Sequence, residues 1–225
     1  MPSKEEILDW VNQEAKINGF SRFSRLEPLR IEASKRVYFR VLNNNQSLIV
    51  NYLEPNESDN NKFAKLSKIF IKHGISVPEV FSCDPKKGFL LQEDFGDRIY
   101  QFDLTSSNFD SLIKSAIHEL IMIQKVPKDT DLFPYFDKSR AVLEMQLFNE
   151  WFLKGLLSIN LKSVSNKEAW DYTKLLEAYE EVWNNIDKQE ETVCHFDFET
   201  RNIINKDGAA GIIDFQDSIV GPVSL

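Results

Sequence analysis

The chain has 225 residues, of which 42% are hydrophobic and 28% charged, so it can bury a substantial core as one large domain or two smaller lobes. Its formal net charge of −8 gives an acidic surface that repels phosphate backbones, which argues against nucleic acid as a partner. Its two cysteines, Cys83 and Cys194, have no metal-ligand spacing, so we expect no disulfide framework and no zinc site, but a cytoplasmic location.

The N-terminal stretch MPSKEEILDWVNQEAKING is charged near its start and contains no long apolar run. It therefore predicts neither a signal peptide nor a membrane span. Ser3 and Glu6 form a capping-box pattern, which predicts a helix with an apolar face that starts at Ile7. Asn18 and Gly19 predict the end of that helix.

Residues 20–94 contain patterns typical of strands, with one helix inserted. Two β-rich runs flank NNNQ in RVYFRVLNNNQSLIVNYL, and this arrangement predicts a hairpin. The stretch DNNKFAKLSKIFIKHG repeats its apolar residues at helical spacing and predicts a helix that ends at Gly74. PEVFSC and FLLQEDF, joined by the turn DPKKG, predict a second hairpin.

After DFGD the pattern changes to long helices rich in Leu, Ile, Phe and Trp. These helical patterns cover residues 107–125, 137–158 and 166–187. Within the second pattern, an apolar stripe at helical spacing predicts a face turned toward the interior; it consists of Phe148, Trp151, Phe152 and Leu156. Short strands return later with TVCHF, NIIN and AGIID. The junction between two lobes is expected near residues 94–98, where the β-rich part gives way to the helical part.

The segment HFDFETRN, residues 195–202, carries polar residues at a spacing that suits phosphoryl transfer. That reaction needs a carboxylate to receive the proton of the acceptor hydroxyl, and oxygen ligands for Mg²⁺. Asp197 is the candidate for the first role; Asn202 and Asp214, which ends the apolar run GIID, are candidates for the second. A lone Asp in such a loop is usually a turn former, but the joint pattern favours catalysis. His195 is expected to hold the loop by hydrogen bonds.

Three segments resemble the aminoglycoside phosphotransferase family, which has the protein-kinase-like fold. They are HFDFETRN as catalytic loop, IIDFQD as metal-binding strand end and FLLQEDFGD as interlobe hinge. Further segments are similar to one group within that family, namely ASKRVYFRV, SLIV, GFLLQEDFGDRIY, LFNEWFL and IIDFQDSIVGPVS. That group is the bacterial amino-sugar kinases of cell-wall recycling, which phosphorylate the anomeric hydroxyl of N-acetylmuramate and N-acetylglucosamine. The resemblance implies an α+β bilobal fold: a β-rich nucleotide-binding lobe over residues 1–94 and a mainly helical lobe over residues 95–225.

The resemblance also assigns roles to particular residues, with ATP and Mg²⁺ as cofactors. It implies that Asp197 is the catalytic base, that Asn202 and Asp214 hold Mg²⁺, and that His195 and Arg201 are structural in the catalytic loop. The backbone at residues 92–94 is expected to meet the adenine edge, and the loop EASKR to cover the phosphates. The residues expected to bind the nucleotide are Ser34, Lys35, Arg36, Arg40, Gln92, Glu93 and Asp94.

The sequence departs from the family pattern in the region that should bind phosphate. The covering loop has Ile31 and Glu32 where the family has a glycine, which lets backbone approach a phosphate closely. The lysine usual on the third strand is absent, and the neutral Asn51 lies near that place. Lys35, Arg36 and Arg40 are candidates to supply the charge. Strand alternation puts Tyr38 and Arg40 on one face, so Arg40 is the best candidate if that face lines the cleft; otherwise Arg36 and Arg40 are solvated strand charges.

The acceptor is less well specified, although a small-molecule hydroxyl, most simply on an N-acetylated amino sugar, is expected. Glu150, Gln216 and Asp217 are weak candidates to contact it. Alternatives are an aminoglycoside or amino-alcohol kinase and an inactive, pseudokinase-like binding module. Family members continue beyond GPVSL, so the resemblance implies an incomplete helical lobe with exposed apolar surface. No membrane association and no obligate protein partner are expected.

Overall fold

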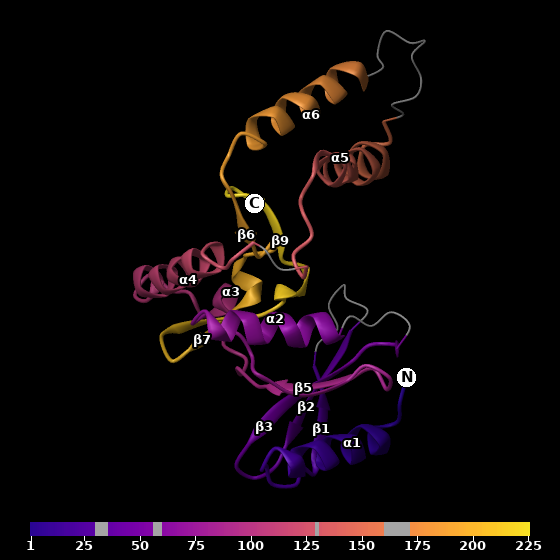
Figure 1. Cartoon of the computed structure of the whole chain (residues 1–225), viewed down its shortest axis with the longest axis vertical. Helices are drawn as coiled ribbons and strands as arrows, with labels where there is room; N and C mark the ends of the chain where they lie inside the picture. Colours follow the sequence, from indigo (N-terminus) through magenta and orange to yellow (C-terminus); the bar gives the residue numbers. More distant parts are fainter. Residues whose placement is uncertain (30–35, 56–59, 129–130, 160–171) are drawn as a thin grey trace. The chain divides into compact units, whose positions relative to one another are not determined.

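The computed structural model describes residues 1–29, 36–55, 60–128, 131–159 and 172–225 (Figure 1). These residues form two compact units: residues 1–126 with 197–217, and residues 127–196 with 218–225. Residues 94–98, where the sequence suggests a junction between lobes, lie inside the first unit. The division at residue 94 therefore stays a prediction based on the family resemblance.

The first unit is built on a five-stranded antiparallel sheet with the order β1-β2-β3-β5-β4. Its strands are β1 (Arg25–Pro28), β2 (Val37–Leu42), β3 (Ser47–Tyr52), β4 (Val80–Asp84) and β5 (Phe89–Glu93). Both predicted hairpins are present, as β2–β3 and β4–β5. The first one turns at Asn43, whose side-chain Oδ1 accepts hydrogen bonds from the N–H groups of Asn45 and Gln46 at 2.9 and 2.8 Å.

One face of this sheet is covered by helix α1 (Lys4–Ile17), which begins with the predicted capping box. The Ser3 Oγ accepts from the Glu6 N–H at 3.2 Å, and the Glu6 carboxylate accepts from the Ser3 N–H at 2.7 Å. Trp10 stacks on Phe89 with ring centroids 5.0 Å apart. The buried core between helix and sheet comprises Ile7, Trp10, Val11, Ala15, Phe23, Phe39, Val41, Leu48, Val50, Phe89 and Leu91.

The other elements of the first unit lie on the opposite side of the sheet from α1, and Figure 1 shows α2 next to the sheet there. These elements are α2 (Asn60–Lys72), α3 (Tyr100–Asp103), α4 (Phe109–Gln124), β7 (Ile203–Lys206), β8 (Ala209–Ile212) and the 3₁₀ turns η3 (Thr200–Asn202) and η4 (Phe215–Asp217). The predicted helix before Gly74 is α2. Phe215 packs on α2 through Phe63 and Phe70, with ring centroids 4.6 and 5.5 Å apart.

The second unit combines helices with a two-stranded antiparallel sheet, β6-β9. Its elements are α5 (Lys138–Leu147), the π-helix η2 (Phe148–Leu156), α6 (Tyr172–Ile186), β6 (Glu191–Cys194) and β9 (Ile219–Pro222). Its core contains Phe136, Ala141, Trp183, Cys194 and Ile219. The predicted helical patterns are thus present where the structure describes them, whereas residues 166–171 of the last one lie outside the described residues. The strand β9 was not predicted.

The apolar stripe predicted to face the interior is exposed instead, so that prediction is wrong. Phe148, Trp151, Phe152 and Leu156 are 44, 76, 42 and 71% exposed. These residues lie in the π-helix η2, and Phe148 stacks on Phe152 with ring centroids 5.1 Å apart, so they share a face, but that face is not turned toward the core of the unit. The residues that η2 buries are Asn149 and Leu153.

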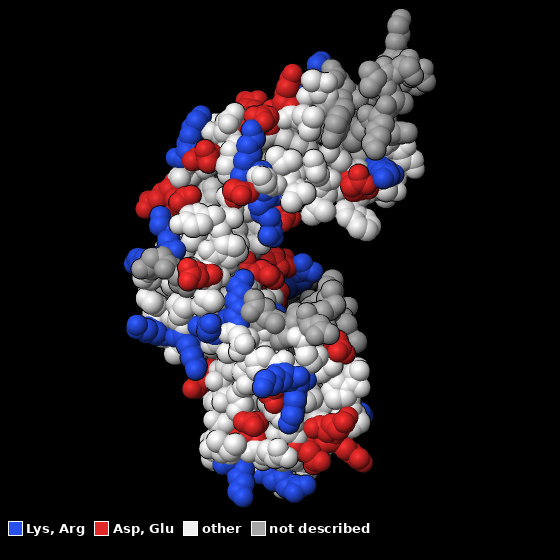
Figure 2. Space-filling model, turned by 45° about the vertical axis from the view of Figure 1, so that its right-hand side comes forward, with Lys and Arg blue, Asp and Glu red and all other residues white. Residues whose placement is uncertain are grey.

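The surface carries charges of both signs. On the face drawn in Figure 2, Lys and Arg side chains lie interspersed with Asp and Glu side chains. Among the described helices, none is both long enough and apolar enough to cross a lipid bilayer.

Candidate active site

A cavity of about 780 Å³ lies in the first unit, on the side of the sheet that faces away from α1. Its walls come from β2, β3 and β5, from residues 94–102 and from the open end of the β7–β8 hairpin, where β7 begins and β8 ends. The side chains that matter for its chemistry are Arg36, Tyr38, Arg40, Gln92, Asn202 and Asp214. A cavity of this volume is large enough to hold a cofactor or a drug-sized molecule.

Strand alternation explains which residues of β2 reach the cavity. Phe39 and Val41 are buried in the core under α1, whereas Tyr38 and Arg40 line the cavity on the opposite face. The shared face expected for Tyr38 and Arg40 is therefore confirmed, and it is the face turned to the cavity. The same alternation exposes Ile49 of β3 to the cavity.

The β7–β8 hairpin brings Asn202 and Asp214 to the same cavity. Its register pairs Ile203 with Ile212, and the N–H of Ile213 donates to the Asn202 carbonyl at 3.0 Å. Residues just outside this end of the hairpin must therefore lie close together, and both Asn202 and Asp214 line the cavity. Asp214 has φ of +62°, a left-handed conformation that directs the chain abruptly out of the strand.

Asp197 is joined to this pair through Asn202. The Asn202 Nδ2 donates to the main-chain oxygen and to the Oδ2 of Asp197, both at 3.0 Å. Because both N–H bonds of the Asn202 amide are directed at Asp197, the Oδ1 of Asn202 remains the atom able to face a cation. The exposed Asp197 is thus held beside the buried Asn202, although Asp197 itself is not among the residues that line the cavity.

The donor atoms around Asn202 and Asp214 suit a hard divalent cation. One carboxylate and one amide oxygen are ligands that Mg²⁺ accepts, and phosphate oxygens and waters commonly complete its octahedron. Among the described residues, His, Cys, Asp and Glu form no group of three that could hold a metal by themselves. Asn202 and Asp214 thus suit a Mg²⁺ ion whose other coordination positions are filled by waters and by phosphate oxygens of a bound molecule.

Gln216 fixes the orientation of the Asp214 carboxylate. Its Nε2 donates to Asp214 Oδ1 at 2.7 Å and to Asp217 Oδ2 at 3.2 Å. Neither Gln216 nor Asp217 is among the residues that line the cavity. The third candidate for the acceptor, Glu150, belongs to the second unit and forms an exposed ion pair with Lys154 at 2.9 Å.

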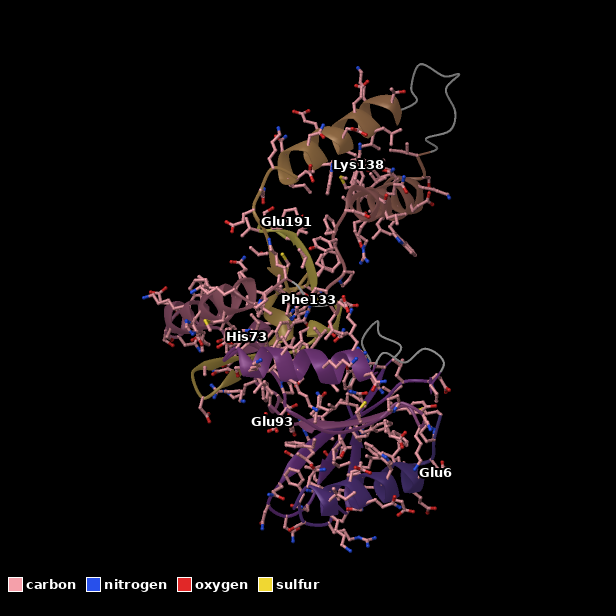
Figure 3. All side chains as sticks on the ribbon, in the orientation of Figure 1. Glu6, His73, Glu93, Phe133, Lys138 and Glu191 are labelled. Carbon is pink, nitrogen blue, oxygen red and sulfur yellow. The ribbon has the colours of Figure 1, made fainter. Side chains whose placement is uncertain are left out.

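The end of β5 and the residues that follow it form one wall of the cavity. Gln92 is 7% exposed, and within the described parts of the chain its Oε1 has no hydrogen-bond partner. A buried acceptor in that state needs a ligand or water to satisfy it. Glu93, labelled in Figure 3, forms an ion pair at 3.3 Å with Lys206, which also lies 3.5 Å above the ring of Phe95. These contacts attach the β7–β8 hairpin to the cavity wall.

Asn51, which lies near the usual position of the third-strand lysine, is fully buried. Neither its Oδ1 nor its Nδ2 finds a hydrogen-bond partner among the residues that the structure describes. Asn51 pairs in register with Tyr38, so it belongs to the same face of the sheet as the cavity wall. A buried amide with both ends unsatisfied is destabilising by about 1–3 kcal/mol for each lost partner.

The basic residues at the site differ in their contacts. Arg36 is 8% exposed and lines the cavity, with its Cζ 5.5 Å from the centroid of the Phe63 ring. The Arg40 guanidinium binds the carboxylates of Asp94 and Asp97, with N–O distances of 2.6 to 3.1 Å. Ser34 and Lys35, also expected to bind the nucleotide, lie outside the described residues.

Burial and neighbouring charges shift the pKa of two cavity residues. Burial raises the pKa of the Tyr38 hydroxyl, and the nearby Asp214 carboxylate raises it further against the opposing effect of Arg36. Burial alone would raise the pKa of Asp94, but hydrogen bonds from Arg40, from the Gly96 N–H and from Ser47 outweigh it, so the pKa is lowered. Tyr38 was not named as a site residue; strand alternation was the signal that could have identified it.

The remaining loop residues are placed as follows. His195 is 1% exposed and follows β6 in the second unit, which agrees with a packed residue but does not test its expected role. Arg201 is exposed, lines the cavity and donates through Nε to Glu199 at 2.7 Å. Phe95 and Phe102 also line the cavity and were missed, because nothing local in the sequence marks them.

Comparison with known proteins adds to this geometry. Residues 25–225 match the family described as the phosphotransferase enzyme family. The chain is also similar to the N-acetylmuramate/N-acetylglucosamine kinase of Pseudomonas aeruginosa, with 31% identity over 201 residues. That alignment covers 89% of the chain but 57% of the relative, so the chain spans somewhat more than half the relative's length.

Solved structures share the fold at low sequence identity. APH(2")-IIa in its ternary complex with streptomycin and ATP superposes with a TM-score of 0.62 at 20% identity, over 99% of this chain and 74% of that one. The choline kinase LicA of Streptococcus pneumoniae superposes with a TM-score of 0.64 at 13% identity, over 98% and 72%. The α+β, protein-kinase-like fold predicted from the sequence is thereby confirmed.

Proposed function

Since the chain belongs to the phosphotransferase enzyme family, we propose that it transfers the γ-phosphoryl group of ATP to a hydroxyl of a small molecule. The observation that carries the proposal is the convergence at one cavity. Asn202 and Asp214 line the same cavity of about 780 Å³, and Asn202 holds the carboxylate of Asp197. These are the parts that phosphoryl transfer requires.

Each residue of the convergent set has a defined task in this reaction. The acceptor oxygen attacks the γ-phosphorus, the bond to the β,γ-bridging oxygen breaks, and the acceptor proton passes to the Asp197 carboxylate. Asn202 orients that carboxylate through its amide. Asn202 Oδ1 and the Asp214 carboxylate would hold Mg²⁺, which when bound neutralises charge on the phosphates. Gln216 keeps the Asp214 carboxylate directed toward the site.

The nucleotide would lie in the cavity against the wall formed by residues 92–97. The buried Gln92 Oε1 is an acceptor for an amino group, and the backbone that follows β5 is available to a purine edge. Among the basic residues of the cavity, Arg36 is suited to the phosphates because it lines the cavity. The charges of Arg36 and Asp214 both affect the pKa of Tyr38, so Arg36 lies near the same side chain as the proposed metal ligand Asp214.

For the acceptor, we favour the anomeric hydroxyl of an N-acetylated amino sugar. The support is the similarity, at 31% identity, to the N-acetylmuramate/N-acetylglucosamine kinase of Pseudomonas aeruginosa. An anomeric hydroxyl is more acidic than an ordinary alcohol, so a carboxylate base such as Asp197 suffices. This reaction would place the protein in the recycling of cell-wall sugars, in the cytoplasm, where ATP is available.

The test is transfer of labelled γ-phosphate to N-acetylmuramate and N-acetylglucosamine by the protein with Mg²⁺. Asp197→Asn should reduce transfer by at least about 10²-fold, because the general base is lost. Asp9→Asn is the matched control, since Asp9 is an exposed residue of α1 far from the cavity lining. Transfer by Asp197→Asn at the wild-type rate would refute the assignment.

A second candidate is a nucleotide-binding module without transferase activity, and Asn51 favours it. A neutral, fully buried amide replaces the cation usual at that strand position. This candidate predicts that Mg·ATP raises the melting temperature while no acceptor is phosphorylated. A panel that adds aminoglycosides and amino alcohols to the amino sugars separates this outcome from a kinase with a different acceptor.

A further inference from the structure

We propose that Arg40 is a positioning residue, which clamps the segment Asp94–Asp97 onto β2 and thereby fixes the wall of the nucleotide cavity. The proposal rests on the function proposed above, because it takes this cavity as the nucleotide site. In this role Arg40 does not bind phosphate, although its position on the cavity face of β2 also made it a candidate for that task.

The contact is a double fork on one guanidinium. Arg40 Nε and Nη2 donate to Asp94 at 2.6 and 3.1 Å, and its Nη1 and Nη2 donate to Asp97 at 2.7 and 2.8 Å. Two parallel N–H···O bonds to each carboxylate fix direction as well as distance. A lysine has no such fork, so the geometry requires arginine.

The segment needs such a clamp because it lies beyond the sheet. The last pair between β3 and β5 joins Leu48 to Glu93, so the backbone after Glu93 receives no further ladder bonds from β3. All four residues of the segment nevertheless line the cavity. Within it, the N–H of Gly96 donates to Asp94 Oδ1 at 2.9 Å, so the conformation of the segment depends on the same carboxylate that Arg40 binds.

The two arms of the clamp differ in burial. The Asp94 side chain is 4% exposed and that of Arg40 14% exposed, whereas the Asp97 side chain is 75% exposed. Ion pairs in contact with water contribute little, while breaking a buried, hydrogen-bonded pair is strongly destabilising. The Asp94 arm therefore holds the segment, and the Asp97 arm adds direction.

The same contacts disfavour a role on phosphate. A guanidinium has five N–H donors, and the four bonds to Asp94 and Asp97 leave one of them for any other ligand. Two carboxylates against one cation also leave the cluster with a net negative charge, which repels phosphate. Arg40 thus lines the cavity, but its guanidinium is bound to Asp94 and Asp97 in the cavity wall.

The experiment compares Arg40→Met, Asp94→Asn and the double variant with wild type, using a fluorescent ATP analogue with Mg²⁺ and steady-state kinetics. Each single change should weaken nucleotide binding and raise the nucleotide KM by about tenfold or more, with kcat within about threefold. The double variant should be no worse than the poorer single one, since both changes break one unit. Asp97→Asn should change KM by about twofold at most.

Two further variants keep the test decisive. Arg40→Lys retains the charge without the fork and should recover only part of the lost affinity. Arg25→Met removes an exposed arginine of β1, paired to Glu27 at 3.7 Å, and should leave binding unchanged. If Arg40→Met lowers kcat at unchanged KM while Asp94→Asn is silent, Arg40 is a phosphate ligand and the clamp is overturned. Additive effects in the double variant overturn it as well.

A measurement without nucleotide separates the clamp from the proposed function. Amide hydrogen exchange at residues 95–97 should be about tenfold faster in Arg40→Met and Asp94→Asn, and unchanged in Arg25→Met. If the wild type binds no nucleotide, the proposed function fails, but faster exchange in these variants still supports the clamp. Unchanged exchange in both of them refutes it.

Discussion

Gly211 of β8 should be intolerant of even one methyl group. A Cβ built on Gly211 would lie 2.6 and 2.8 Å from two ring carbons of Phe95 and 2.9 Å from Cδ of Lys206. Carbon atoms in contact are normally about 3.5–4.0 Å apart, so the ring would have to move by about 1 Å. Phe95 is 9% exposed and lines the cavity, so that movement disturbs both the packing and the site.

The net effect of Gly211→Ala follows from two opposed terms. Replacing glycine by alanine at a compatible position stabilises by about 0.4–1 kcal/mol through the unfolded chain. Overpacking a filled site is destabilising by about 1–3 kcal/mol. The steric term is the larger, so we expect a net loss of about 1–2 kcal/mol in the free energy of unfolding.

Urea denaturation followed by circular dichroism measures this loss. Combining Gly211→Ala with Phe95→Leu should be less destabilising than the sum of the two single changes, because the smaller side chain makes room for the methyl group. Gly155→Ala is a milder comparison, since its Cβ would meet only the Glu150 carbonyl, at 3.2 Å, and should be less destabilising than Gly211→Ala. A Gly211→Ala protein as stable as wild type would refute the argument that the hairpin presses on Phe95.

Two other predictions concern the charges of the site. The pKa of Asp94 is lowered in the folded state, so its ionised form stabilises the fold at pH values above about 4, where an unfolded Asp is ionised. This stabilisation is lost as the pH falls through the lowered pKa of the folded state. Urea midpoints between pH 2 and 7 should show the advantage of wild type over Asp94→Asn shrinking in acid; a pH-independent difference would contradict this. Asn202→Ala removes the amide that orients Asp197 and one oxygen donor, so kcat should fall by about 10–100-fold. Steady-state phosphate transfer measures it, and an unchanged kcat would mean that Asn202 has neither role.

Local signals were sufficient for most of the fold. The hairpin at NNNQ was predictable because Asn43 makes its hydrogen bonds within three residues, and the capping box at Ser3 is equally local. The π-helix η2 was not predictable from apolar spacing, since that spacing presupposes 3.6 residues per turn. Nor was β9, whose partner β6 lies more than twenty residues earlier in the chain.

The site divides in the same way. Asp197, Asn202 and Asp214 could be proposed as candidates from spacing, because all three fall within one short strand-turn-strand segment. The partners of Arg40 were not identified, because Asp94 and Asp97 are 54 and 57 residues away in sequence. Which charge on a strand face meets which loop is decided by tertiary packing, and no single-sequence pattern carries that information.

The first unit is discontinuous, since residues 127–196 intervene between its two parts. Its late hairpin nevertheless makes contacts of high sequence separation, such as the bond at 2.8 Å from the Ala210 N–H to Ser115 Oγ. During translation the sheet and α4 leave the ribosome first, and the hairpin follows on the order of 10 s later at ordinary elongation rates. Until the hairpin emerges, the first unit therefore lacks the residues from 197 onward that complete the wall of its cavity.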